Sequence, residues 1–322
     1  MSPTQNPDAV VECVPNFSEG TDAAKVASII AAMRVDEVRL LDWSMDAAHN
    51  RSVVTIAGPP AAVVESAVRG ASRAAELIDL TQQTGVHPRI GAADVVPFVP
   101  VSGISLAQCA VLARQAGMEI WRRARVPVYF YEAAAARGDR MNLEDVRRGQ
   151  FEGLRETAHR DPLRRPDVGG PEIHPTAGAS AVGARRFLIA YNIYLQPAVP
   201  ARDLPASAQP EISAARAMAR AIRASDGGLN GVKAIGVNVN GRAQLSMNIT
   251  DHRAVPVAQI HARVGELARD HGVSIAEGEL IGLIPEEAYD PAANWLREIP
   301  GFDPSTKVLE RRLNHPLPWP GE

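Results

Sequence analysis

The chain has 322 residues, of which 46% are hydrophobic and 22% charged, and its formal net charge is −3 at pH 7. These proportions are close to those of soluble globular proteins, so they allow a sizeable core and exclude wholesale disorder. No block of lysine and arginine is present, which argues against nucleic-acid binding because such proteins need a basic surface.

The first part of the chain alternates short apolar runs with longer segments of helical periodicity. The expected strands are 9–14, 38–44, 51–58, 94–101 and 126–132, and the expected helices are 22–34, 60–83 and 105–124. This order is the split βαβ pattern of ferredoxin-like domains, extended by one more helix and strand. The two directly joined strands in the middle argue against a doubly wound fold, in which strand and helix alternate strictly.

Residues 137–183 are dense in Arg, Gly, Pro and Asp and predict loops, and a second βαββαβ pattern follows them. Its expected strands are 187–195, 232–240, 243–250 and 273–285, and its expected helices are 211–225 and 256–272. The predicted fold class is therefore α+β, with two ferredoxin-like subdomains, antiparallel or mixed sheets, and helices packed on one face of each sheet. The predicted subdomains are 1–187 and 188–322, and the boundary is expected near residues 183–192.

Two cysteines, Cys13 and Cys109, are too few for a disulfide framework or a paired metal motif. The opening residues are polar and lack the apolar core of a signal peptide, and no apolar run reaches membrane-spanning length. We therefore expect a cytoplasmic protein that does not enter a membrane. No sequence pattern of a metal site or a phosphate-binding loop is present, and no metal is expected.

A histidine and an arginine flank Pro88 where a helix is expected to give way to a strand. The residue before a proline is pushed out of the helical region, so His87 should project from the helix end. Imidazole titrates near neutral pH, which suits a catalytic base. The alternative is that His87 caps the helix C-terminus and that Arg89 is solvated.

Polar residues also gather at the end of the first strand and in the connection between residues 38–44 and 51–58. They are possible contacts to a substrate, and the alternative is an ordinary turn. These residues are Asn16, Asp42, Ser44, Asp46, Asn50 and Arg51.

A stretch with three glycines and two prolines lies within the expected loops. Such composition lets backbone groups approach a flat ligand, although a surface connector is an equal alternative. The stretch is Gly169, Gly170, Pro171, Glu172, Ile173, His174, Pro175, Thr176, Ala177 and Gly178.

Several of these motifs together resemble those of the glutamate formimidoyltransferase (formiminotransferase) family. The matching motifs include VECVPNFSEG at 11–20, HPRIGAADVVPFVPV at 87–101 and GASAVGARRFLIAYNIYL at 178–195. The resemblance runs from about residue 11 to residue 285 in the order of the family. It implies transfer of a formimino group from N-formimino-L-glutamate to tetrahydrofolate, two ferredoxin-like subdomains and a homodimer.

The resemblance also implies roles for particular residues. His87 takes the place of the catalytic base, and residues 169–178 take the place of the folate-binding segment. Arg51 and Arg89 are candidates to hold a glutamate carboxylate as bidentate pairs. Where the family often has an acidic residue, this chain has Ser44 followed by Asp46, so either Asp46 substitutes in the proton relay or the relay differs.

The cyclodeaminase domain that is fused in mammals is not expected, because the sequence ends at Glu322. A formylglutamate-dependent formyltransferase, or a 5-formyltetrahydrofolate-processing enzyme, is the alternative on the same fold. A folate-binding protein without catalysis is the alternative of a different class.

Overall fold

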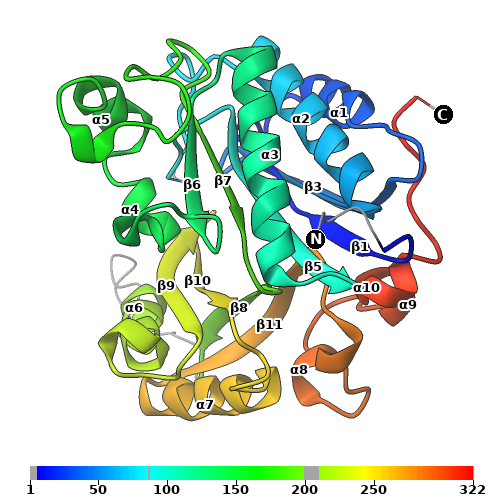
Figure 1. The fold of residues 1–322 in the computed structure, drawn as a ribbon. Helices are drawn as coiled ribbons and strands as arrows, with labels where there is room; N and C mark the ends of the chain where they lie inside the picture. Colours follow the sequence, from blue (N-terminus) through cyan, green and yellow to red (C-terminus); the bar gives the residue numbers. More distant parts are fainter. Residues whose placement is uncertain (1–5, 86–87, 199–209, 322) are drawn as a thin grey trace. The chain divides into compact units, whose positions relative to one another are not determined.

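The computed structural model describes residues 6–85, 88–198 and 210–321. The chain divides into two compact units (Figure 1). The first is Met1–Arg186 with Pro316–Glu322, and the second is Phe187–His315. The predicted α+β class is confirmed, because one unit is built on a mixed sheet and the other on an antiparallel sheet.

The first unit contains a seven-stranded sheet among the described residues. Its strands are β1 (Val10–Cys13), β2 (Asn16–Phe17), β3 (Arg39–Asp46), β4 (Arg51–Gly58), β5 (Ala93–Ser102), β6 (Val128–Glu132) and β7 (Ser180–Ala184). β1 and β2 each pair with both β4 and β5, so they act as one strand that is interrupted at Val14 and Pro15. The spatial order is thus β3, β4, β1/β2, β5, β7, β6, and only β5–β7 and β7–β6 are parallel pairs.

Three long helices cover one face of this sheet: α1 (Ala23–Ala32), α2 (Pro60–Leu77) and α3 (Leu106–Ala124) (Figure 1). Local signals fix where they begin. The Asp22 side chain caps α1 by accepting from two backbone N–H groups, Pro60 opens α2, and Ser105 with Gln108 forms a capping box on α3. Their apolar faces pack with the sheet into one core.

The predicted helix 60–83 is wrong at its C-terminal end, because α2 stops at Leu77. Apolar residues continue past that point, but Leu80 donates its N–H to the carbonyl of Thr176 instead of to a helical partner. The Asp79 side chain also accepts from the backbone N–H of Thr81, a turn that competes with helix. A long-range contact therefore ends the helix six residues early.

The prediction that residues 137–183 are loop-like is wrong in part. The segment contains α4 (Leu143–Val146) and α5 (Gln150–Thr157), and it leads into β7. β7 lies between β5 and β6 and is buried at all five positions. Its residues Ser-Ala-Val-Gly-Ala have small side chains, so they do not produce the apolar signal by which buried strands are recognised.

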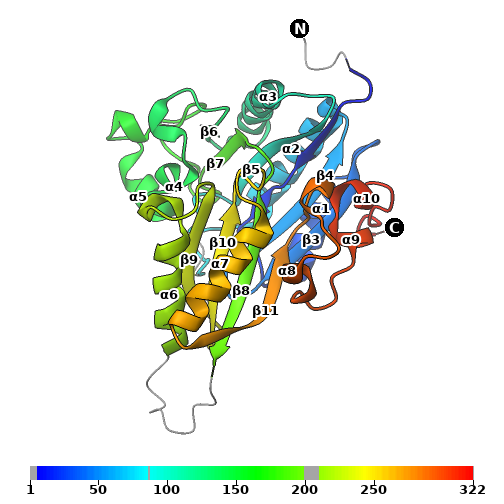
Figure 2. The ribbon, with the colours of Figure 1, turned by 90° about the horizontal axis from the view of Figure 1, so that it is seen from below.

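The second unit has a four-stranded antiparallel sheet in the order β11, β8, β10, β9, which is the ferredoxin-like order. The strands are β8 (Ile189–Pro197), β9 (Val232–Val239), β10 (Arg242–Ile249) and β11 (Val273–Ile281). Helices α6 (Pro210–Ile222) and α7 (Val257–Asp270) lie over one face of the sheet (Figure 2). Three short helices follow: α8 (Asn294–Arg297), α9 (Pro304–Lys307) and α10 (Leu309–Arg312).

After α10 the chain returns to the first unit. There the backbone N–H of Leu317 donates to the carbonyl of Leu40 at 2.7 Å, beside the edge strand β3. The predicted subdomain limits of 1–187 and 188–322 stay a prediction.

Candidate functional site

Loops of the first unit meet at the edge of the sheet where β5 and β7 begin. The loop before β5 and the turn before β7 are joined by backbone hydrogen bonds of 2.9 Å: Ala92 N–H to Ala177 O, and Ala179 N–H to Ile90 O. The sequence had placed candidate functions in both segments, the first around His87 and the second at residues 169–178. Tertiary structure brings them into direct contact.

Glycines make this contact possible. A Cβ on Gly91 would collide with the carbonyl oxygen of Ala179, and a Cβ on Gly178 would collide with that of Ile90. Gly178 also has a φ of +69°, which other residues rarely adopt. These two glycines therefore serve the close approach of two backbones.

The turn between β3 and β4 is tied to the same loops by Asn50. The Asn50 side chain accepts from the backbone N–H of Gly20 at 2.9 Å and donates to the carbonyl of Thr84 at 3.0 Å. Gly85 lies against this turn, since a Cβ there would be 2.8 Å from the carbonyl of His49. Asn50 thus holds three loops together through both ends of its amide.

His87 lies outside the described residues, as does Val86. Its neighbours Gly85 and Pro88 belong to the loop just described. The helix that His87 was expected to follow ends at Leu77, and residues 78–85 are not helical.

Arg89 is not solvated, contrary to the alternative that the sequence left open. It is 8% exposed, and its guanidinium donates to the carbonyl of Gln83 at 2.9 Å and to the Glu152 carboxylate at 3.1 Å. Its own carbonyl accepts from Phe151 at the start of α5. Arg89 therefore fixes the loop before β5 against α5.

A group of alternating charges lies beside these loops. Asp94, at the start of β5, accepts from the backbone N–H of Ile90 at 2.7 Å and pairs with the guanidinium of Arg147. Arg51 is directly opposite Asp46 across the β3–β4 pair, so the two residues share one face of the sheet.

The electrostatics of this group favour an anionic ligand. Burial lowers the pKa of Arg51, and the neighbouring charge of Arg147 lowers it further, while Asp94 and Asp46 offset part of the effect. The Nε atom of Arg147 is buried without a hydrogen-bond partner among the described residues. A carboxylate at this position would gain from both guanidinium groups.

The Asp46 carboxylate contacts His49. Its carboxylate accepts from the backbone N–H of His49 at 3.0 Å and lies 2.5 Å from the Nδ1 atom of that ring. Burial raises the pKa of Asp46, but these hydrogen bonds outweigh it and the pKa is lowered. Asp46 is thus a carboxylate in contact with an imidazole, beside the loop that contains His87.

The remaining predicted residues of this region follow the strands. Asp42, Ser44 and Asp46 alternate along β3 and so share one face. Asn16 faces the same side, because the register places it opposite Val53, which is opposite Ser44. Asp42 lies about 13 Å from Asp46 along the strand, so it is remote from the loop contacts.

The stretch 169–178 has two parts. Residues 169–172 are exposed, and Gly169 lies against the Trp121 ring of α3. In the second part, His174 and Gly178 close a tight turn by two backbone hydrogen bonds, and the His174 Nδ1 atom accepts from the N–H of Ala177 at 3.0 Å. Burial lowers the pKa of His174, and its ring braces the turn through the contact with Ala177.

Sequence reasoning missed Asp94 and Arg147. Asp94 is in a matching motif, but a lone carboxylate before an apolar strand gives no sign of its partner. Arg147 belongs to a segment read as loop, and its partner is 53 positions away. An arginine pair at 147–148 after a short acidic run was the one available signal, and such pairs are common on surfaces.

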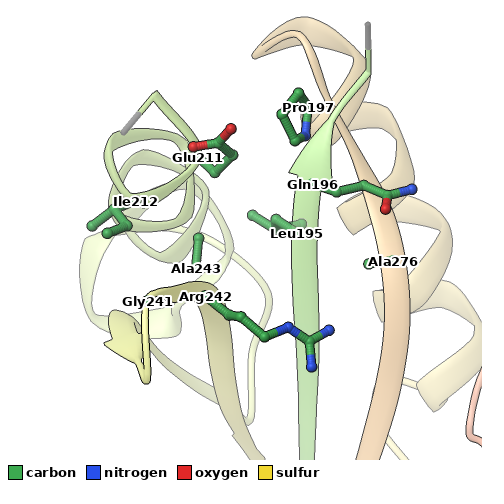
Figure 3. Close-up of a pocket in the computed structure, with 9 residues that line it drawn as sticks. All are labelled: Leu195, Gln196, Pro197, Glu211, Ile212, Gly241, Arg242, Ala243 and Ala276. Atoms are coloured by element: carbon green, nitrogen blue, oxygen red, sulfur yellow. The ribbon is translucent and has the colours of Figure 1, made fainter. Parts of the chain in front are cut away.

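Other features of the described residues lie elsewhere. A hollow of about 300 Å³ in the second unit is lined by residues of β8, β10 and α6, and it contains none of the predicted site residues (Figure 3). Among the described residues, no three His, Cys, Asp or Glu side chains are grouped to hold a metal ion, and no helix is both long and apolar enough to cross a membrane.

Comparison with protein families matches almost the whole chain. The N-terminal subdomain of the formiminotransferase domain matches residues 10–185, and the formiminotransferase domain matches residues 190–310. The chain belongs to the formiminotransferase family. The recognition made from the sequence motifs is confirmed.

Two curated members of the formiminotransferase family are similar over nearly their full length, and a longer one is similar over about half of its length. The chain is 39% identical to the glutamate formimidoyltransferase of Streptococcus pyogenes serotype M1, covering 94% of this chain and 98% of the relative. It is 40% identical to the enzyme of that name from Thermoplasma acidophilum, covering 95% and 97%. The formimidoyltransferase-cyclodeaminase of Gallus gallus is 36% identical over 89% of this chain and 52% of the relative.

Proposed function

We propose that this chain transfers the formimino group of N-formimino-L-glutamate to tetrahydrofolate, giving 5-formiminotetrahydrofolate and L-glutamate in histidine degradation. The observation that carries the proposal is the identity of 39–40% to two proteins named glutamate formimidoyltransferase, over almost the entire length of all three chains. The charges of the site support it, since Arg51 and Arg147 suit a substrate with carboxylates.

In the proposed mechanism, N5 of tetrahydrofolate attacks the formimino carbon and a C–N bond forms. His87 takes the proton that N5 loses as the tetrahedral centre forms. The bond from this carbon to the glutamate nitrogen then breaks, and His87 returns the proton to that nitrogen. Such acid–base catalysis contributes roughly 10²–10⁴-fold, and the alignment of two bulky anionic substrates contributes much of the rest.

Other residues are proposed to position the substrates. The two ends of the loop that contains His87 are held by Asn50 and Arg89, which are positioning residues rather than direct contacts. Arg51 and Arg147 are proposed to bind a glutamate carboxylate, and residues 169–178 are proposed to contact the folate. Asp46 is proposed to take the part of the acidic group that the family often has at the position of Ser44.

We also propose that the enzyme is a cytoplasmic homodimer and that it needs no metal. The formyl alternative differs from the formimino donor at a single atom, C=O in place of C=NH. A turnover assay with tetrahydrofolate therefore compares formiminoglutamate with formylglutamate. Faster turnover of formylglutamate would reject the proposed donor, and folate binding without turnover of either donor would favour the non-catalytic alternative.

Replacement of His87 tests its role. We expect His87→Ala and His87→Asn to lower kcat by about 10²–10⁴-fold with a much smaller change in KM, because the proton shuttle is lost while carboxylate contacts remain. Steady-state kinetics with both substrates measures this. A His87→Asn variant that keeps most of its kcat would show that the imidazole moves no proton.

A further inference from the structure

Helices α6 and α7 cover one face of the second sheet (Figure 2), and the opposite face carries a polar cluster of Asn192, Gln244 and Glu279. Along β8, Tyr191 and Ile193 pack in the core, so Asn192 between them points to the opposite face. Glu279 of β11 is directly opposite Asn192, and Gln244 of β10 is opposite Tyr194, two positions along β8. The three polar side chains therefore share one face.

These side chains converge on one carboxylate oxygen. Asn192 Nδ2 donates to Glu279 Oε2 at 2.9 Å, and Gln244 Nε2 donates to the same oxygen at 3.2 Å. Asn192 is 9% exposed and Gln244 3%, whereas Glu279 is half-buried. Two buried amides thus hold the carboxylate in a single orientation.

The other oxygen of this carboxylate is unused. An ionised carboxylate can accept about four hydrogen bonds, but Oε1 of Glu279 accepts none from the part of the chain that the structure describes. Arg242 is a cation on the same face, but it pairs with Glu277 at 2.6 Å and stacks over the Tyr194 ring at 4.1 Å. Glu277 is therefore paired with an arginine, whereas no arginine among the described residues pairs with Glu279.

We propose that Glu279, oriented by Asn192 and Gln244, binds a planar N–C–N edge in which one carbon carries two N–H donors. A carboxylate matches such an edge with two parallel hydrogen bonds. This inference rests on the proposed function, under which two substrates have this chemistry. One is tetrahydrofolate, through the 2-amino edge of its pterin, and the other is formiminoglutamate, through its amidinium group.

The test is calorimetric binding to the full chain with two probes, 5-formyltetrahydrofolate and formiminoglutamate. Glu279→Gln keeps an oxygen for the two amides but turns an NH₂ group toward the ligand, so its fold should be retained and its melting temperature checks this. Glu277→Gln is the matched control, two residues away on the same strand and face. We expect Glu279→Gln to weaken one probe by about 10- to 100-fold and Glu277→Gln to change neither.

The probe whose binding is weakened by Glu279→Gln identifies the substrate that Glu279 contacts. If Glu279→Gln binds both probes as the wild type does, and the wild type catalyses the transfer, this inference is overturned and the proposed function stands. An equal loss in both variants also overturns it, because general charge on the face would then be responsible. A wild type that neither binds the probes nor turns over overturns both proposals.

Discussion

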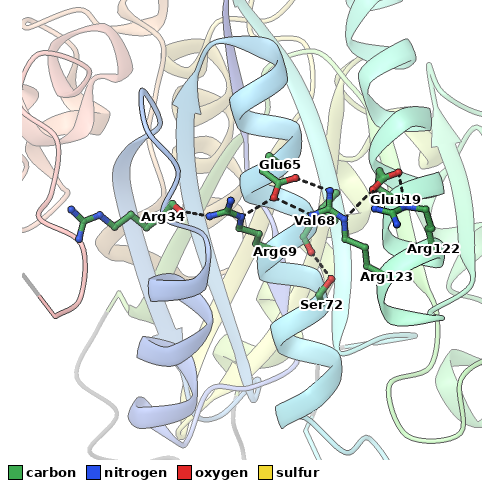
Figure 4. A network of polar contacts seen from close by, with 8 residues as sticks. All are labelled: Arg34, Glu65, Val68, Arg69, Ser72, Glu119, Arg122 and Arg123. Carbon is green, nitrogen blue, oxygen red and sulfur yellow. Dashed lines mark hydrogen bonds and ion pairs between the residues drawn. The ribbon is translucent and has the colours of Figure 1, made fainter.

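The first unit holds carboxylate–guanidinium pairs in two different settings. On the outer surface of α2 and α3, a chain of exposed pairs runs from Arg69 through Glu65 and Arg123 to Glu119 and Arg122 (Figure 4). At the edge of the sheet, the pairs Arg147–Asp94 and Arg140–Asp167 are almost completely enclosed by protein. The surface chain links more residues. When a surface pair breaks, its groups can bind water, whereas the buried groups have little access to water.

Burial decides what each setting does. In an exposed ion pair, two charged groups give up part of their contact with water for contact with each other, so the pair contributes little to stability. A buried pair is costly to form, but removal of one partner leaves an uncompensated charge away from water. The buried pairs therefore fix the positions of loops, such as the one before β5, and the exposed chain only adjusts the stability of two helices that already pack together.

Loss of the Asp94 carboxylate is expected to have the largest effect. Asp94→Ala removes the partner of Arg147 and the acceptor for the Ile90 N–H, so we expect the free energy of unfolding to fall by about 3–5 kcal/mol. Denaturant unfolding measures it. Asp94→Asn keeps an acceptor for Ile90 and should lose less. If Asp94→Ala cost no more than a substitution in the surface chain, burial would not be what separates the two settings.

The close approach of the two site loops gives the next largest effect. Gly178→Ala puts a Cβ against the Ile90 carbonyl at a positive φ, and we expect a loss of about 1–3 kcal/mol in unfolding free energy. Gly138→Ala is the matched control, since a Cβ there meets nothing within 4 Å. Equal stability of the two variants would show that the loops can separate without cost.

Acidification should lower the stability of the protein through Glu19, a buried carboxylate near the same loops. Burial raises the pKa of Glu19, but hydrogen bonds from Thr21 and Asp22 and the charge of Lys25 outweigh it, so the folded-state pKa is lowered. Its stabilisation is therefore complete above the unfolded pKa of about 4.3 and is lost as the pH falls through the folded value.

Glu19→Gln should make the free energy of unfolding depend less on pH between neutral and acidic pH, as unfolding experiments over this range measure. The variant loses stability near pH 7 and differs less from the wild type at low pH. A constant difference across the range would mean that Glu19 titrates alike in the folded and unfolded chains.

The surface chain should give the smallest effect. Glu65→Gln breaks the contacts of Glu65 with Arg69 and Arg123, and we expect less than about 1 kcal/mol in unfolding free energy. Salt should reduce the difference further, because it screens exposed charges. Thermal unfolding at low and high salt measures both. A loss as large as that of Asp94→Ala would remove the distinction between exposed and buried pairs.

Local patterns in the sequence were enough to predict the long elements. Alternation and helical periodicity in segments of eight or more residues correctly located α1, α3, α6 and α7 and most strands, because each buries an apolar face whose spacing is visible along the chain. The family motifs were likewise contiguous, and they identified the family before any contact was known. They also placed His87, whose role stays a prediction.

Tertiary structure alone decided the features that depend on distant partners. α2 ends at Leu77 because Leu80 bonds to Thr176, and β7 forms because its small residues fit between two other strands. Arg147 reaches Asp94 across 53 positions, and Glu279 meets Asn192 across 87. Such contacts give no periodic signal, because charge and small size are equally common on exposed loops. Only the fold, by removing water from some of these groups and not from others, distinguishes a surface arginine from one that holds a site.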